Sequence, residues 1–162
     1  SEIGSYHLVD ETLHFEIDFP VEPEITKDKV QTEIGELTNN LFVLDGKKVV
    51  NDPNYMYILN TIIYPNKDIT SEKVDELDDF FDNTIMGAAS TVNGKPSKAK
   101  PISFRDYPGR ESVISFNQNK GSIVMQLFLI ENQMYVLQVV TPTKDLGNEA
   151  SNNFFSSFNV LD

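Results

Sequence analysis

The chain has 162 residues, of which 40% are hydrophobic and 23% are charged, an ordinary composition for a globular protein. It carries 13 Lys and Arg against 25 Asp and Glu, and this net charge of -12, with the lysines scattered, argues against a nucleic-acid or anionic-membrane partner. The absence of cysteine excludes disulfides, thiolate metal sites and cysteine nucleophiles.

Three strands are predicted in the first half of the chain. Hydrophobic residues alternate with polar ones from Leu13 to Phe19, the period-two pattern of a half-buried strand, and Pro20 ends it. Residues 30–44 are predicted to be extended up to a turn signal at 45–47, and a third strand runs from 55 to 64.

The strongest helix pattern follows these strands. Thr70 is a suitable N-cap, with Ile69 and Val74 placed to form a hydrophobic staple around it. The stripe that should face the core has three- and four-residue steps and consists of Val74, Leu77, Phe81, Ile85 and Ala88. The acidic residues at 75–79 and 82 occupy much of the remaining surface, and we interpret them as a solvated face rather than a calcium site.

The second half of the chain predicts four more strands, over about residues 100–106, 110–117, 122–130 and 134–141. The last two are apolar on both faces, which is typical of central strands that have material packed on each side. A closing helix over about 145–156 would supply part of one outer layer.

The predicted fold is therefore α+β, with three layers in the order α/β/α around a largely antiparallel central sheet. The elements follow the order βββ-α-ββββ-α. We expect residues 1–162 to form a single domain, with residues 1–12 as a loose N-terminal arm. No apolar run approaches the roughly 20 residues that a membrane helix needs.

Four stretches of sequence, in this order, resemble the PsbP-like superfamily, which includes the PsbP protein of photosystem II and the bacterial DcrB-like lipoproteins. FEIDFPVEP at 15–23 resembles the family's opening strand, and YPGRE at 107–111 is similar to the corner before its second group of strands. LFLIENQMYVLQVVTP at 127–142 resembles the late hairpin, and FFSSFNVL at 154–161 resembles the C-terminal helix.

The resemblance implies a PsbP-like fold and a non-catalytic accessory or binding domain that acts outside the cytoplasm, in the periplasm or cell envelope. It implies a protein partner and no cofactor, and it carries over no catalytic residues because the family as a whole has no catalytic signature. We expect an export segment or lipid anchor to belong to the full-length precursor, since none is visible in this sequence.

RDYPGRES at 105–112 contains both arginines of the chain. Pro108 and Gly109 suit the centre of a type II turn. Such a turn would place Arg105, Tyr107 and Arg110 on one face, where two guanidinium groups beside a phenol could bind an anion. We prefer the structural alternative, a hairpin corner whose arginines pair with neighbouring carboxylates.

Tyr55 and Tyr57 are further candidates for a ligand or partner contact, because tyrosine combines a large apolar body with a polar tip. The two histidines, His7 and His14, lack a third ligand or a nucleophile elbow, so no catalytic, cofactor or metal site is predicted. Two alternatives stay open. One is a small-ligand or anion carrier that uses the Arg105, Tyr107 and Arg110 surface, and the other is a small hydrolase whose carboxylates come from distant strands.

Overall fold

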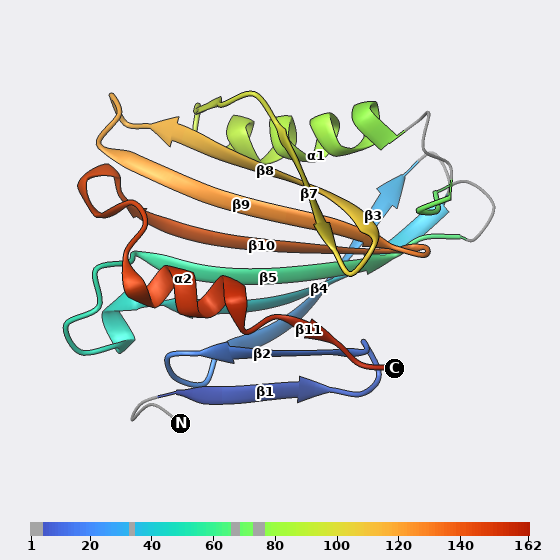
Figure 1. Cartoon of the computed structure of the whole chain (residues 1–162), viewed down its shortest axis with the longest axis horizontal. Helices are drawn as coiled ribbons and strands as arrows, with labels where there is room; N and C mark the ends of the chain where they lie inside the picture. Colours follow the sequence, from blue (N-terminus) through green and yellow to red (C-terminus); the bar gives the residue numbers. More distant parts are fainter. Residues whose placement is uncertain (1–4, 33–34, 66–68, 73–76) are drawn as a thin grey trace.

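The structure, a computed structural model, describes residues 5–32, 35–65, 69–72 and 77–162, and Figure 1 shows its elements. The strands are β1 (Tyr6–Asp10), β2 (Phe15–Phe19), β3 (Glu24–Thr32), β4 (Gly35–Asp45), β5 (Met56–Ile63), β6 (Lys95–Pro96), β7 (Lys100–Phe104), β8 (Tyr107–Phe116), β9 (Gly121–Ile130), β10 (Gln133–Pro142) and β11 (Asn159–Val160). The helices are α1 (Leu77–Thr91) and α2 (Glu149–Ser156), with short 3₁₀ helices η1 (Gly46–Lys48) and η3 (Thr143–Asp145).

The strands of the described residues form two sheets. The main sheet has the order β3-β4-β5-β10-β9-β8-β6, and β7 pairs with β8 off this path. The small sheet has the order β1-β2-β11. Every strand pair is antiparallel, so the prediction of a largely antiparallel sheet is confirmed.

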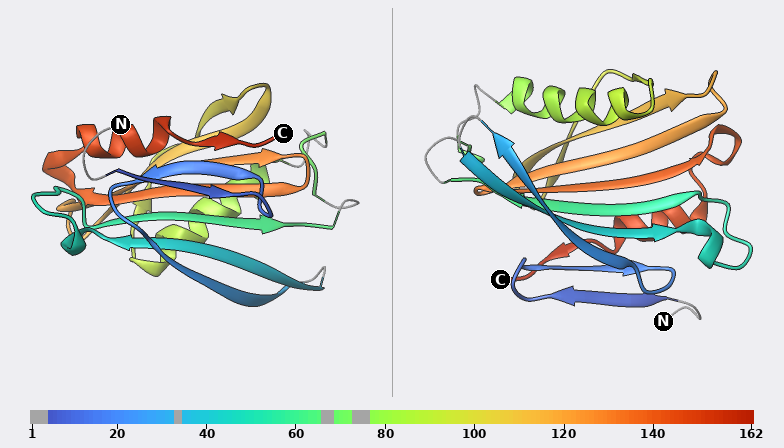
Figure 2. Two further views of the ribbon diagram at one scale, coloured as in Figure 1. Left: turned by 90° about the horizontal axis from the view of Figure 1, so that it is seen from below. Right: turned by 180° about the vertical axis from the view of Figure 1, so that it is seen from behind.

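The doubly apolar strands β9 and β10 lie in the middle of the main sheet, where each face is covered. On one face, α1 packs Leu77, Phe81 and Ile85 against the sheet. The sheet residues under α1 are Met125, Leu127, Leu129, Met134 and Val136. The other face of the same strands is covered by the small sheet together with α2, and Figure 2 shows α1 and α2 on different sides of the main sheet.

The predicted three-layer α/β/α arrangement and the predicted order βββ-α-ββββ-α are not confirmed. The second outer layer is a small sheet with α2 beside it. In the described residues five strands precede α1, five lie between α1 and α2, and β11 follows α2. The strand predicted at 13–19 belongs to this small sheet as β2. Its inward residues Phe15, Ile17 and Phe19 are buried, whereas its other face is polar, so it can pack on one side only.

One segment expected to be loose is paired in a sheet, and one edge strand is left uncovered. Residues 6–10, expected to be part of a loose arm, form β1, which pairs with β2 from Tyr6↔Phe19 to Asp10↔Phe15. The pairing is stabilised because Leu8 is buried beneath it. The edge strand β3 is exposed along its whole length, so the covering layers do not reach this edge of the main sheet.

The predicted helix stripe is confirmed in α1, with a small shift at its end. Its buried residues are Leu77, Phe81, Ile85 and Ala89. Steps of four keep these side chains on one face, so Ala89 takes the buried place expected of Ala88, which is only partly buried. Val74, one half of the predicted staple, lies outside the described residues.

The hairpin at RDYPGRES turns earlier than predicted. Phe104 pairs with Tyr107, so Arg105 and Asp106 form the turn, and Arg105 takes the positive φ of 49°. Gly109 lies inside β8, where an added Cβ would come within 2.5 Å of the Leu127 carbonyl oxygen. The glycine is therefore required by close packing between strands rather than by a turn.

Candidate functional site

The two arginines of the hairpin do not form a common site. The Arg105 guanidinium contacts the end of the chain, where it donates to Asn159 Oδ1 (2.8 Å) and pairs with Asp162. The Arg110 guanidinium lies on the opposite side of the sheet, 4.9 Å from the ring centre of Phe81, and pairs with Asp78 of α1. Each arginine is thus engaged in holding a different element against the sheet.

The tyrosines proposed as contacts are also separated. Tyr107 packs against the core shared with the small sheet, three residues along β8 from Arg110 and on the other face. Tyr57 is buried, and its hydroxyl donates to Asp52 Oδ1 (2.9 Å) while it accepts from Asn54 Nδ2 (2.7 Å). Desolvation by burial raises the pKa of Tyr57. Tyr55 remains exposed, so it is the only member of this pair that a partner can reach.

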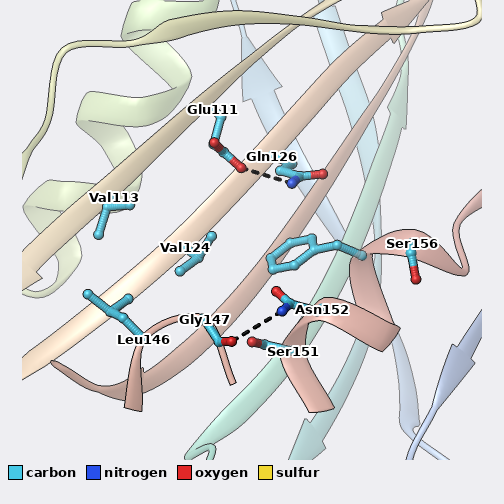
Figure 3. A pocket seen from close by; sticks show the side chains of 10 residues that line it. Glu111, Val113, Val124, Gln126, Leu146, Gly147, Ser151, Asn152 and Ser156 are labelled. Carbon is cyan, nitrogen blue, oxygen red and sulfur yellow. Dashed lines mark hydrogen bonds between the residues drawn. The ribbon is translucent and has the colours of Figure 1, made fainter. Parts of the chain in front are cut away.

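A groove that the sequence did not predict runs between α2 and strands β8 and β9 of the main sheet; we call it the α2 groove (Figure 3). Its volume is about 560 Å³, within the range of about 300–1,000 Å³ that is typical of ligand sites. Its walls come from β8, β9, the turn after η3, and α2. The larger side chains that line it are Glu111, Val113, Val124, Gln126, Leu146 and Phe155.

The position of α2 beside this groove is set by Asn148. Asn148 is the N-cap of α2: its side-chain oxygen accepts a hydrogen bond from the backbone amide of Ser151 (2.9 Å). Its amide nitrogen donates to Asn54 Oδ1 (2.7 Å), and Asn54 is also bonded to the buried Tyr57 hydroxyl. The start of α2 is therefore tied to the loop that precedes β5, and through it to the main sheet.

The polar side chains of the α2 groove differ in charge and in the hydrogen bonds that they already make. Glu111 is the one ionisable side chain in its lining, and its Oε2 accepts from Gln126 Nε2 (2.9 Å). The two hydroxyls are used within α2, since Ser151 donates to the Asn148 carbonyl (2.9 Å) and Ser156 to the Asn153 carbonyl (3.3 Å). The sequence offered one signal for this site: Gln126 interrupts an otherwise apolar strand face between Val124 and Phe128.

A second groove lies on the other flank of α2, between this helix, β2 and η1, with a volume of about 870 Å³. Its floor includes Phe19 and Phe154, and its rim carries Lys48 and Glu149. Val50, which also lines it, is 88% exposed. The helix α2 is thus a ridge between two grooves, and its outward face is available to a partner.

The histidines do not assemble catalytic machinery in the described residues. His7 lies on the exposed face of the small sheet, where its Nδ1 contacts Asp18 (2.6 Å) and its Nε2 contacts Glu16 (2.9 Å). The hydrogen bond to Asp18 raises the pKa of His7. His14 forms the turn before β2 with a φ of 62°, and its carbonyl accepts from the Leu161 amide.

The described residues form neither a metal-binding cluster nor a membrane-spanning helix. They contain no group of three or more His, Cys, Asp or Glu placed to hold a metal ion. Neither helix in this part of the chain combines the length and the hydrophobicity needed to cross a membrane.

No family model and no curated protein matches the sequence. Among solved structures, the chain is similar to cyanobacterial PsbP (CyanoP) from Synechocystis sp. PCC 6803, whose structure was determined in solution. The match covers 99% of this chain and 94% of that chain, with a TM-score of 0.62 and 11% sequence identity. This similarity establishes the architecture and confirms the resemblance at the level of fold. The chain therefore has a PsbP-like fold.

Proposed function

We propose that this chain is a non-catalytic accessory domain that binds a protein partner through α2 and the two grooves beside it. The observation that carries the proposal is the α2 groove, a concave surface of about 560 Å³ that combines apolar side chains such as Val113, Val124 and Phe155 with placed polar groups such as Glu111 and Gln126. Concave surfaces that combine apolar walls with placed polar groups are the usual form of small-molecule sites, and grooves that bind a peptide segment of a partner protein share this form. We place the domain outside the cytoplasm, in a bacterial envelope and with a lipid anchor on its precursor, by analogy with the PsbP-like fold.

The geometry disfavours both alternatives. An anion carrier would need Arg105 and Arg110 to converge, but each is paired with a different carboxylate on a different element. A hydrolase would need a pair of acid and base groups around one cleft. The α2 groove contains a single carboxylate, Glu111. The second groove contains two, Asp18 and Glu149, but Asp18 is already hydrogen-bonded to His7 (2.6 Å).

The proposal can be tested by photocrosslinking from defined positions. We would place p-benzoylphenylalanine at Asn152, which lines the α2 groove, or at Asn153, which lines the second groove. Asp82, exposed on α1, is the matched control. The folded domain would be irradiated with the envelope fraction of its source cells, and the crosslinked products would be separated by mass.

We expect the same crosslinked protein from Asn152 and Asn153, because both positions border the α2 ridge, and no such product from Asp82. Products that appear only from Asp82, or equally from all three positions, would contradict the proposal. Such a result would mean that α2 is not the surface that meets the partner.

A further inference from the structure

We propose that the α2 groove binds a segment of the partner that presents a lysine or arginine beside an apolar side chain, with Glu111 as the acceptor of its positive charge. This inference rests on the proposed function and specifies the chemistry of the bound segment.

The apolar half of the groove favours a hydrophobic side chain. Val113 and Val124 project from neighbouring strands, where they are direct cross-strand partners, and both are partly exposed. Phe155 of α2 lines the same groove, and Leu146, 42% exposed, closes one end (Figure 3). An apolar side chain seated among these four would remove hydrophobic surface of both partners from water.

The polar half of the groove favours a donor. Each side-chain donor group in the lining already makes one hydrogen bond: Gln126 Nε2 donates to Glu111, Asn152 Nδ2 donates to the Gly147 carbonyl (3.1 Å), and the serine hydroxyls donate within α2. Among the described residues, Glu111 Oε1 and Gln126 Oε1 accept no hydrogen bond. The two amide groups each keep a second N–H, so the feature that favours a cationic donor is the carboxylate of Glu111, which Gln126 holds in place.

Charge supports the same choice. Glu111 forms no ion pair within the described residues, although Lys100 lies directly across from it in the β7–β8 register. Lys100 is exposed and does not line the groove. The net charge of -12 attracts cations to the molecule and repels acidic segments. A lysine or arginine at Glu111 would form a charge-assisted hydrogen bond, which is stronger than a neutral one.

The test uses three capped tripeptides as probes, acetyl-Leu-X-Leu-amide with Lys, Gln or Glu at X, titrated into the ¹⁵N-labelled protein and followed by amide chemical shifts. We expect the Lys peptide to bind about tenfold more tightly than the Gln peptide. The shifted amides should include Gln126 and Asn152. Glu111→Gln should remove the preference for Lys, and added salt should weaken it.

Glu11→Gln is the matched control, because Glu11 is exposed in the β1–β2 turn, away from the groove, and its loss changes the net charge equally. Thermal unfolding of both variants checks that each is folded. The inference is overturned if Glu111→Gln keeps the preference, if Glu11→Gln reduces it as much, or if the shifts map elsewhere. Lack of binding at millimolar concentrations would also overturn it.

A fourth probe, phenethylammonium, tests whether the groove binds a small amine rather than a segment of a partner protein. If it binds at Glu111 while the Lys peptide does not, the assignment to a protein segment is wrong. Crosslinking from Asn152 and Asn153 tests the proposed function separately. A partner captured there, without any Lys preference, would leave the accessory role standing and remove only the inference about charge.

Discussion

Phe81→Ala tests the packing of α1 on the main sheet. The Phe81 side chain is fully buried, in a cluster with sheet residues that include Leu127 and Val136. Removing a buried phenylalanine ring costs about 3–5 kcal/mol, because transfer energy is lost and a cavity remains. The Arg110 guanidinium also loses the ring 4.9 Å beneath it, a contact worth roughly 0.5–1 kcal/mol. Since α1 lies on the surface and can settle partly into the cavity, we expect a total loss of about 4 kcal/mol.

The measurement is urea unfolding followed by far-UV circular dichroism and tyrosine fluorescence, which also checks whether the transition stays two-state. Met86→Ala is the matched control, because Met86 lies on the same helix with 55% of its surface exposed, and it should change the free energy of unfolding by less than about 0.5 kcal/mol. A loss of under roughly 1 kcal/mol for Phe81→Ala would refute the packing of α1 on β9 and β10. A lower denaturant slope with separated transitions would mean that α1 unfolds by itself.

Three further predictions concern the charged and polar contacts. His7 has a raised pKa in the folded state, so its stabilising contribution is complete below the unfolded value of about 6.5 and is lost as pH rises through the folded pKa. His7→Gln should therefore lower the melting temperature at about pH 5 and leave it unchanged at about pH 9, and an equal loss at both would exclude the imidazolium bridge. Arg110→Ala should lower the free energy of unfolding in urea by about 1–2 kcal/mol, because its guanidinium is mostly buried over Phe81. Arg105→Ala should lower it by less than about 1 kcal/mol. A larger loss for Arg105→Ala than for Arg110→Ala would contradict these placements. Asn148→Ala removes both the N-cap of α2 and the link to Asn54. We expect it to lower the free energy of unfolding by about 1–2 kcal/mol in the same assay. An unchanged free energy of unfolding would mean that packing alone holds α2.

The local pattern of the sequence was enough to locate most of the secondary structure. The alternation at 15–19 predicts β2, and the steps of four from Leu77 predict the buried face of α1. The doubly apolar runs predict that β9 and β10 are central. These predictions succeed because a side chain's direction within one element depends only on the period of that element.

The placement of one element on another was decided by the tertiary structure. The pattern of β2 requires that one face be buried, but it does not say against what, and β2 joins the small sheet rather than the main one. At the hairpin, the β7–β8 register places the turn at Arg105 and Asp106, and Gly109 lies inside β8, where the strands approach closely. This earlier turn leaves Tyr107 and Arg110 three residues apart in one strand, so they face opposite ways.

In the α2 groove, too, the sequence predicts the individual elements and the tertiary structure decides how they come together. The sequence by itself determined that Glu111 and Gln126 lie on strands and that residues near 150 form a helix. Only the folded chain brings them together, because the antiparallel register sets Glu111 beside Gln126, and the Asn148 contact with Asn54 holds α2 across from them. Contacts between residues far apart in the chain depend on register and packing, which a local period does not contain.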